Sequence, residues 1–483
     1  MNDAKKHQWI LIILTLAIVV AVAGLLARCY YELSGVMYGD TMIFQTVGRG
    51  MLNGLKPYSG LFETKPPGIF MMHALSLWLF DSQLLVKILQ VLALLTIPVM
   101  VFIPAVHFMS ERSAKQRQVL TLTSILFGIV LALYTGDQAG MGLTESYGVA
   151  AVLLYLFFLC RPKPNILLLG VFILIAVGLK EPFLLIILSC VLLLKKNLLH
   201  AFVYPLLVAV FMGLSILFAL GYLEPFFSVY LPHMFGFHVY QHNVPLPIRA
   251  LEVWRTFINI GAYSWWLAGC ITVLWISSFS RATALRLLTA SYLFFLAIAV
   301  GGDFYGHHFV FAVPCYVVMY WLLLQGVERS RWWIKVFALL LVLSVFQTRF
   351  IYHIDEWHRT EADHKAVASV VDSVMDNCGY DRYIQMIARG GGPYAYTKHS
   401  PAGPIFVHYS RFIGGSPMYQ SAYISALQNA PLAFVLDIDE SNFTDIAKEM
   451  IRENFSENAP ACAGEGFVQP SPYHLLFRHE EGI

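Results

Sequence analysis

The 483-residue chain is 58% hydrophobic and only 13% charged, and its formal net charge is +2. Soluble domains average about 45–50% apolar and about 25% charged residues, so this composition excludes a wholly water-soluble globule and makes lipid the solvent for much of the chain. The near-neutral charge and the scattered basic residues also give no sign of a nucleic-acid partner.

The first predicted element is a membrane-spanning helix near the N-terminus. Lys5 and Lys6 precede an apolar run over residues 9–27. At about 20 residues the run is long enough to cross a bilayer, and it exceeds the roughly 7–15 residues of a signal-peptide core. We therefore predict a retained helix rather than a cleaved leader.

An amphipathic helix is predicted in the loop that follows. Asp40 opens a segment with apolar residues at Ile43, Val47, Met51 and Leu55, which is helical spacing. A carboxylate at the N-terminal end of a helix is favoured by the helix dipole and can cap the helix. Capping is therefore the purely structural alternative to a chemical role for Asp40.

Farther along the loop, Glu63-Thr-Lys65 precedes a Pro-Pro-Gly sequence, which forms a rigid turn. A charged turn ahead of a helix is the plain structural interpretation. The apolar stretch 69–80 comes next, and at about 12 residues it is too short to cross the bilayer. We predict a helix lying at the outer interface, with His73 and Trp78 near headgroup depth.

Basic clusters in the breaks between the apolar runs predict the topology. Short cytoplasmic loops carry an excess of Lys and Arg, so these breaks share one side and alternate with outer breaks. Counting the alternating inner and outer breaks gives about eleven membrane spans, with the N-terminus inside and the C-terminus outside. The predicted spans are residues 9–28, 86–109, 119–135, 146–160, 166–179, 183–194, 198–220, 256–280, 287–300, 309–327 and 333–351.

The pair of spans 166–179 and 183–194 is short, so the break between them is predicted to lie below the outer surface. Lys180, Glu181 and Pro182 form this break. Polar backbone at such depth is tolerated only inside protein or beside a wet cavity. The alternative is a Lys180–Glu181 pair that reaches up to the interface.

From about residue 352 charges become frequent and long apolar runs stop. Strands alternating with a helical pattern predict a small α/β domain of about 120 residues. The predicted strands are 381–388, 433–437 and 474–477, and the predicted amphipathic helix is 445–454.

The predicted organisation is therefore an all-α polytopic membrane domain over 1–351, with a first outer loop at 29–85, and an extracytoplasmic α/β domain over 352–483. Cys378 and Cys462 lie in that outer domain. In an oxidising compartment they would form a disulfide, and otherwise they are two thiols. The sequence leaves this choice open.

The first loop resembles a known family. An acidic residue after the first span, then Gly54-x-x-Pro-Tyr58, then Glu63-x-Lys65-Pro-Pro-Gly68, is similar to integral-membrane glycosyltransferases of the GT-C fold. The similarity is to the bacterial branch related to protein O-mannosyltransferases and the lipid A aminoarabinose transferase. It covers about residues 28–80 well and 136–145, 179–182 and 301–314 more loosely. It implies the same topology as the charge pattern and says almost nothing about the substrate.

The resemblance implies roles for three loop residues. Asp40 would act as general base on the acceptor hydroxyl or orient the acceptor, because a neutral hydroxyl must lose its proton as it attacks. Lys65 would hold the donor phosphate, and Glu63 would hold Lys65 or sugar hydroxyls. Many family members have a second acidic residue beside the first, where this chain has Thr41, so a two-carboxylate site at this position is in doubt.

Further residues match the family in later outer breaks. Glu145 matches an acidic position in the second outer loop, although it would also serve as a helix cap. Lys180 resembles the family's Lys-x-Pro break, where a cation would neutralise the phosphate leaving group. Tyr305, His307 and His308 match a Tyr and His pattern and are expected to bind substrate or phosphate.

Metal binding has weaker support from the sequence. His307 and His308, together with His233, His238 and His242, offer imidazoles, but no zinc-ligand spacing stands out. We assign no metal-binding residue, and a divalent cation remains the one cofactor to consider.

The sequence thus predicts a hexosyl- or pentosyltransferase in a bacterial plasma membrane. It would move a sugar from a polyprenyl-phosphate donor to a lipid, glycan or protein hydroxyl on the outer face. The alternative is a polytopic lipid or sugar transporter or flippase, which would place charges near mid-span rather than at the outer ends. A binding protein with a sensory outer domain leaves the acidic first loop unexplained. The sugar, the acceptor and the isoprenoid length are not identified.

Overall fold

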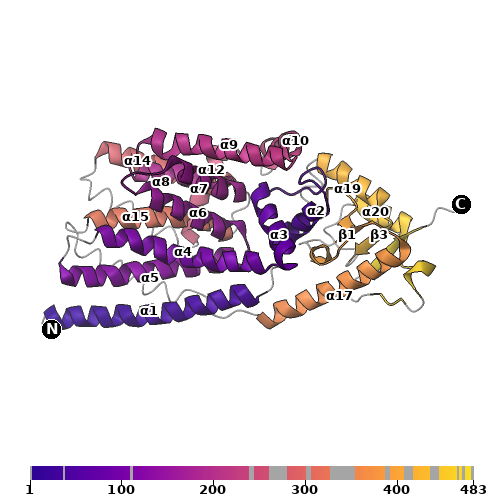
Figure 1. Cartoon of the computed structure of the whole chain (residues 1–483), viewed down its shortest axis with the longest axis horizontal. Helices are drawn as coiled ribbons and strands as arrows, with labels where there is room; N and C mark the ends of the chain where they lie inside the picture. The colour runs from indigo at the N-terminus through magenta and orange to yellow at the C-terminus, as the bar shows by residue number, and fades with distance from the viewer. Residues whose placement is uncertain are drawn as a thin grey trace. The chain divides into compact units, whose positions relative to one another are not determined.

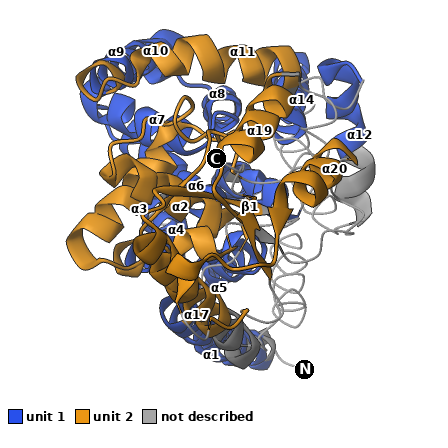
Figure 2. Cartoon of the chain, turned by 90° about the vertical axis from the view of Figure 1, so that its right-hand side faces the viewer, with its two compact units in different colours: residues 1–34, 87–216, 242–352 blue, residues 35–86, 217–241, 353–483 orange. Residues whose placement is uncertain are grey.

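The structure is a computed structural model, built mainly of helices with one small sheet (Figure 1). It forms two compact units, each assembled from three stretches of sequence (Figure 2). Unit 1 comprises Met1–Ser34, Lys87–Ile216 and His242–Tyr352, and unit 2 comprises Gly35–Val86, Leu217–Gln241 and His353–Ile483. The described residues are 3–35, 39–108, 113–238, 244–259, 280–300, 306–326, 354–386, 392–406, 417–435, 445–464, 467–469 and 474–479.

Apolar helices make up unit 1. Within the described residues, five helical stretches are long and apolar enough to cross a membrane, as expected of an integral membrane protein: His7–Ser34, Leu84–His107, Ala114–Ala139, Leu199–Ala219 and Arg281–Val300. They belong to α1 (Asp3–Ser34), α4 (Leu84–Phe108), α5 (Ala114–Ala139), η1 (Leu199–Val203) with α9 (Tyr204–Ala219), and α14 (Arg281–Val300). The shorter helices are α6 (Thr144–Leu159), α7 (Ile166–Leu179), α8 (Phe183–Leu193), α12 (Leu246–Asn259), η4 (Gly306–Phe311) and α15 (Ala312–Gly326).

A helix occupies each predicted span that falls among the described residues. The predicted span 166–179, for example, is α7, and 119–135 lies inside α5. The span 333–351 and most of 256–280 lie outside the described residues. The total of about eleven spans therefore stays a prediction.

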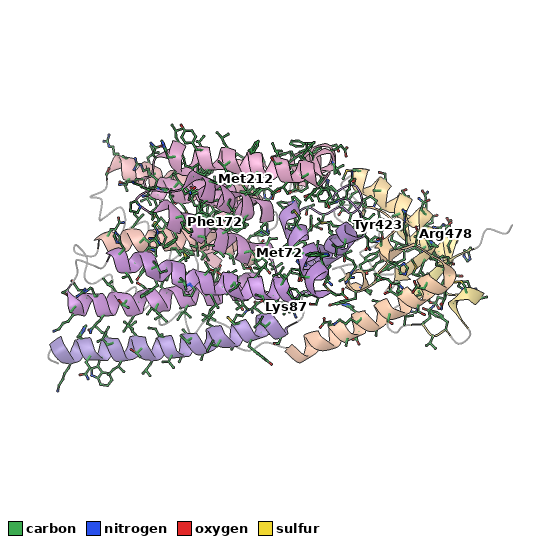
Figure 3. All side chains as sticks on the ribbon, viewed as in Figure 1. Met72, Lys87, Phe172, Met212, Tyr423 and Arg478 are labelled. Carbon is green, nitrogen blue, oxygen red and sulfur yellow. A yellow bond between two sulfur atoms is a disulfide. The ribbon has the colours of Figure 1, made fainter. Side chains whose placement is uncertain are left out.

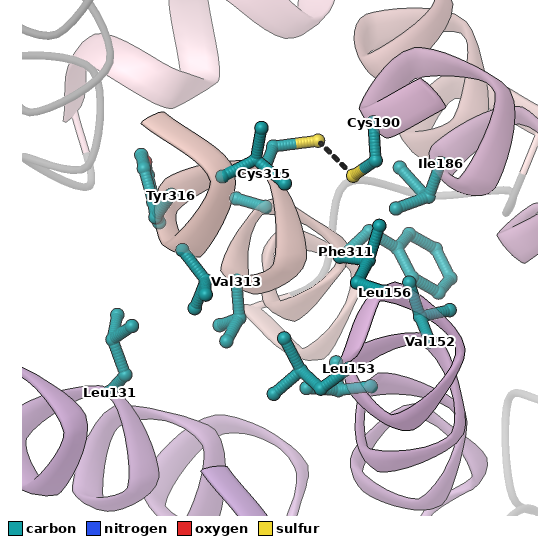
Figure 4. Packing of buried hydrophobic residues seen from close by; sticks show 14 of the residues in the cluster. Leu131, Val152, Leu153, Leu156, Ile186, Cys190, Phe311, Val313, Cys315 and Tyr316 are labelled. Carbon is teal, nitrogen blue, oxygen red and sulfur yellow. Dashed lines mark hydrogen bonds between the residues drawn. The ribbon is translucent and has the colours of Figure 1, made fainter. Parts of the chain in front are cut away.

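Close helix packing holds unit 1 together. Lipid is as apolar as the side chains, so helices in a membrane associate through tight packing rather than through the hydrophobic effect. At Gly148 of α6, an added Cβ would overlap the ring of Phe183 at the start of α8. That ring meets Phe311 edge-on, with centroids 4.8 Å apart. In the same buried cluster the Sγ atoms of Cys190 and Cys315 lie 3.8 Å apart (Figure 4). The N-terminal ends of α6 and α8 are thereby held together.

Unit 2 begins with two helices from the first loop, α2 (Asp40–Leu52) and α3 (Pro67–Phe80). They cross at Gly48, where an added Cβ would lie 2.8 Å from the backbone nitrogen of Ala74. The helix predicted over 69–80 is confirmed. Trp78 is 71% exposed, but His73 is fully buried beside Gly48, and its ring meets Phe44 edge-on. The close approach at Gly48 covers His73, and its depth near the headgroups stays a prediction.

Helical turns from the middle of the chain also belong to unit 2. They carry an aromatic group that packs on the first loop: the rings of Tyr58 and Tyr230 lie 4.6 Å apart, and Phe62 and His233 lie 4.8 Å apart. The turns are α10 (Leu223–Pro225), η2 (Phe226–Tyr230), α11 (Leu231–His233) and η3 (Met234–His238).

The C-terminal part of unit 2 contains the sheet, in the strand order β2-β1-β3-β5-β4. β1 runs parallel to β2 and β3, whereas β5 runs antiparallel to β3 and β4; Ile384 pairs with Ala433, and Ala433 with Leu476. The strands are β1 (Arg382–Met386), β2 (Ser400–Pro401), β3 (Leu432–Val435), β4 (Phe455–Ser456) and β5 (His474–Arg478). The helices are α17 (Ile354–Cys378), η6 (Gly392–Ala395), α19 (Pro417–Asn429), α20 (Asp445–Asn454) and η7 (Ala461–Ala463).

The three predicted strands are confirmed as β1, β3 and β5, and the predicted helix as α20. The sequence missed α17 and α19. Both helices mix polar residues with buried apolar ones at helical spacing, such as Val367, Val371 and Val374 in α17, but the polar residues make that period hard to detect. It also missed β2 and β4, because two residues are too few to show an alternating pattern.

Two links close the C-terminal part. A disulfide joins Cys378, at the end of α17, to Cys462 in η7, across 84 positions of sequence. The structure thus decides a pairing that the sequence left open. Arg478 of β5, labelled in Figure 3, donates from Nε to the carbonyl oxygen of Ala430, and this bond ties the sheet to the segment after α19.

The first loop is bound to the C-terminal part within unit 2. Gln45 of α2 donates from Nε2 to the carbonyl oxygen of Ala395 at 2.8 Å. The backbone N–H of Phe62 donates to the carbonyl oxygen of Pro404 at 2.7 Å. The backbone just before Glu63 is therefore held by residues more than three hundred positions away.

Candidate active site

A break between two helices places Lys180 inside unit 1. Pro182 lacks a backbone N–H and disfavours a helical residue before it, so α7 ends at Leu179 and α8 begins at Phe183. Lys180 takes an extended conformation, with φ −162° and ψ 121°. Its side chain is buried, and its ammonium forms an ion pair with the carboxylate of Glu145. The Lys180 side chain is thus buried against Glu145 and does not reach out to the surface, as the alternative requires.

Glu145 lies in the first turn of α6 and is only 1% exposed. Its Oε1 faces Lys180, and its Oε2 accepts a hydrogen bond from Thr144 Oγ1 at 3.1 Å. A buried pair of this kind is stable only because each charge compensates the other. The sequence predicted both residues as candidates but not their pairing.

Two adjacent histidines reach the same carboxylate from η4. The Nε2 atom of His307 lies 3.9 Å from Glu145 Oε1, and the rings of His307 and His308 lie 4.3 Å apart. Lys180 Nζ lies 5.4 Å from the ring centroid of Phe311, at the end of η4. Unit 1 thus brings together four predicted site residues from three separate breaks. Tyr305, a fifth, lies outside the described residues.

The donor set of this cluster is one that metals use. Glu145, His307 and His308 each offer a ligand atom, and these atoms lie within 4.8 Å of one another. Two imidazoles and a carboxylate suit a zinc-like ion with an open position. Against this fit, the ammonium of Lys180 already neutralises Glu145. The sequence considered these histidines together with His233, whose ring packs against Phe62 and Tyr419 in unit 2.

Asp40 is the first residue of α2 in unit 2. Gly39 takes the cap position with φ 64°, and within the described residues no side-chain hydrogen bond caps this helix. Asp40 is therefore not the N-cap residue, but it lies at the N-terminal end of α2 as predicted, where the helix dipole favours its half-buried carboxylate. That structural role stands beside the chemical role, which is tested below.

Glu63 and Lys65 form an ion pair beside Asp40. Lys65 Nζ lies 3.8 Å from Glu63 Oε1, and Tyr58 donates from its hydroxyl to the carbonyl oxygen of Lys65 at 3.0 Å. Burial raises the pKa of Glu63, Lys65 opposes that rise, and the negative charge of Asp40 adds to it. Unit 2 therefore brings the three predicted loop residues into one electrostatic group.

Sequence reasoning did not single out several buried polar residues. Arg28, Glu32 and Gln90 are at most 3% exposed in unit 1. Glu32, four residues after Arg28 on the same helix, was the available signal, because a charge pair at helical spacing can form a salt bridge.

Comparison with known proteins reveals the fold. No protein-family model matches the sequence, and no curated protein matches it either. The crystal structure of ArnT from Cupriavidus metallidurans in the apo state superposes with a TM-score of 0.50, at 12% sequence identity, over 98% of each chain. The same protein bound to undecaprenyl phosphate gives 0.46, again at 12% identity, over 97% of this chain and 98% of that one.

A third similar structure is archaeal oligosaccharyltransferase AglB from Archaeoglobus fulgidus, in complex with an inhibitory peptide and a dolichol-phosphate. Its TM-score is 0.42 at 12% identity, over 91% of this chain and 70% of that one. At such low identity a likeness establishes fold alone. The chain has the GT-C fold of the apo ArnT structure, as the resemblance of the first loop implies.

Proposed function

We propose that this chain is a glycosyltransferase that moves a sugar from a polyprenyl-phosphate donor to an acceptor hydroxyl at the outer face of a membrane. The observation that carries the proposal is the buried ion pair of Glu145 and Lys180, with the partly buried His307 beside it, in a unit of mainly apolar helices within a chain of GT-C fold. Burying charges among membrane helices is costly, so such a cluster is retained for chemistry by default.

In the proposed reaction Asp40 accepts the proton of the acceptor hydroxyl as that oxygen attacks C1 of the sugar. The bond between C1 and the phosphate oxygen breaks, and polyprenyl phosphate leaves with the bonding electrons. One displacement inverts the configuration at C1. The ammonium of Lys65 neutralises the departing phosphate, and Glu63, 3.8 Å away, holds that ammonium in place.

The residues of unit 1 are assigned to donor binding. Lys180 offers a second cation for a phosphate, and Glu145 sets its position through their ion pair. His307, His308 and Tyr305 are proposed as further substrate contacts. A divalent cation, if used, would be held by Glu145, His307 and His308, and it would supply positive charge toward a phosphate.

The proposed location is a bacterial plasma membrane, with the N-terminus in the cytoplasm and the C-terminal part of unit 2 outside. The disulfide between Cys378 and Cys462 supports that side, because disulfides persist in oxidising compartments and are rare in the cytosol. The proposed partners are a polyprenyl-phosphate sugar, membrane lipids, and a glycan, lipid or protein acceptor.

Transfer and transport make different products, which provides the test. The full-length protein is reconstituted into vesicles with extracts of radiolabelled polyprenyl-phosphate sugars, and label is followed into acceptors and into the vesicle lumen. We expect the label to appear on an acceptor. In cells that lack the gene, we expect mass spectrometry to show that a lipid-linked sugar accumulates and that a surface glycan lacks this sugar. Uptake of a labelled solute with no transfer would favour the transporter.

Acid is expected to lower kcat/KM at a pH above the ordinary glutamate pKa of 4.5, because burial raises the pKa of Glu63. Below the raised pKa the carboxyl is neutral and no longer holds the Lys65 ammonium, whereas above it the pair is intact. The stability of the folded protein depends on pH in the opposite direction. The raised pKa of Glu63 contributes stability that is fully present below the pKa of this residue in the unfolded chain, and this contribution is lost as the pH rises through the pKa in the folded protein.

The measurement is a pH profile of kcat/KM for wild type and Glu63→Gln. The acid limb should move to lower pH in Glu63→Gln, and the exposed-residue control Glu252→Gln should keep the wild-type profile. An unchanged limb in Glu63→Gln would assign the titration to another group.

A further inference from the structure

The turn between α5 and α6 has a backbone that needs outside support. It runs through Met141 at φ 59° and Gly142 at φ 86°, both in the left-handed region. That region is unfavourable for a residue with a side chain such as Met, and it persists only where the surroundings hold it. Three residues later the chain reaches Glu145, so the conformation of this turn decides where that carboxylate points.

Glu32 of α1 holds the turn from one side. Its Oε2 accepts a hydrogen bond from the backbone N–H of Met141 at 2.7 Å, and its Oε1 pairs with Arg28 one helical turn earlier. Both side chains are at least 96% buried. Gly140 lets them approach, since an added Cβ there would collide with Arg28 and Glu32.

Gln90 of α4 holds the turn from both ends. Its Nε2 donates to the carbonyl oxygen of Ala139, the last residue of α5, at 3.4 Å. Its Oε1 accepts from the hydroxyl of Ser146, in the first turn of α6, at 2.7 Å. Ser146 also donates to the carbonyl oxygen of Leu143 at 3.0 Å. The fully buried amide of Gln90 therefore links the two ends of the turn, and one of its two partners is Ser146, the residue next to Glu145.

We propose that Glu32 and Gln90 are positioning residues, which hold residues 140–143 so that Glu145 stays on Lys180. Neither contacts substrate in this proposal. The consequence for donor binding rests on the proposed function, in which the Glu145–Lys180 pair contacts the donor. The support of the turn itself does not depend on that chemistry.

The test uses full-length protein in nanodiscs and two independent variants. Arg28→Met/Glu32→Leu removes the pair without leaving a buried charge, and Gln90→Leu removes the bridging amide. Glu252→Gln, at an exposed position of α12, is the control. Hydrogen exchange of peptides covering residues 139–146 should accelerate by about tenfold in both variants, the equivalent of one net hydrogen bond. Exchange in α8 should match wild type.

Kinetics with a polyprenyl-phosphate sugar separate positioning from folding. A protein that is merely less stable loses active molecules, which lowers kcat and leaves KM unchanged. A misplaced Glu145–Lys180 pair should raise KM by about tenfold while kcat stays within about twofold. Arg28→Met/Glu32→Gln should recover part of the loss, because the amide oxygen of the glutamine still accepts from Met141 and no buried charge is left unpaired.

Unchanged exchange at 139–146 in both variants would overturn the proposal. Faster exchange with an unchanged KM would overturn the link from the turn to the site. If wild type transfers no sugar yet exchange accelerates in the variants, the proposed function fails while the support of the turn by Glu32 and Gln90 stands.

Discussion

Asp40→Asn is expected to lower kcat for sugar transfer by about 10²–10⁴-fold, the usual loss when a general base is removed. Asparagine keeps the size of the side chain but cannot accept the proton of the acceptor hydroxyl. Because Gly39 takes the cap position and Asp40 does not cap α2, the substitution should leave folding intact. The expected signature is lost turnover at an unchanged melting temperature.

The matched control for this prediction is Asp81→Asn in the same unit. Asp81 is exposed at the end of α3, and its left-handed φ of 47° is one that asparagine tolerates. We expect wild-type transfer from this control. Normal turnover by Asp40→Asn would remove Asp40 from the mechanism, and a fall in melting temperature that parallels the loss of turnover would show a structural role.

Glu145→Gln is expected to destabilise unit 1 strongly, since it leaves the ammonium of Lys180 buried without its carboxylate. Removing one partner of a buried ion pair typically costs about 3–5 kcal/mol. Lys180→Met should cost a similar amount, because it strands the carboxylate of Glu145. Thermal unfolding of each variant in nanodiscs measures this loss.

The double variant Glu145→Gln/Lys180→Met separates stability from function. With neither charge buried, most of the stability should return, and donor binding should remain lost because the cation is gone. The exposed pair Asp381 and Arg382, 3.2 Å apart, is the control. Breaking a solvent-exposed pair changes stability by only about 0.2–1 kcal/mol. Full transfer by the double variant would take the Glu145–Lys180 pair out of the mechanism.

Local patterns predicted the elements whose character is local. A long apolar run can be stable only as a helix in lipid, so residues 166–179 could be identified as α7 from composition. The amphipathic period of residues 445–454 predicted α20 for the same kind of reason. The helix α17 was missed because its many charged residues hide a buried apolar period, and the disulfide that links its end to a residue 84 positions away could not be assigned from the sequence.

Candidate site residues could be chosen from the sequence, but their partners could not. Lys180 has Glu181 as its sequence neighbour, yet it pairs with Glu145, 35 positions earlier, because Gly148 lets α6 and α8 close on each other. His73 is buried because Gly48 lets α2 and α3 close in the same way, a contact that the sequence did not show.

The sequence by itself determined the solvent of this protein, the helical character of its membrane part, and the loop whose acidic and basic residues resemble the GT-C glycosyltransferases. Those properties follow from composition, period and short motifs, which act over a few residues. Only the tertiary structure decided which charges are buried together and which turn holds them. The energy of a buried charge depends on the atoms around it in space, and those atoms come from helices far apart along the chain.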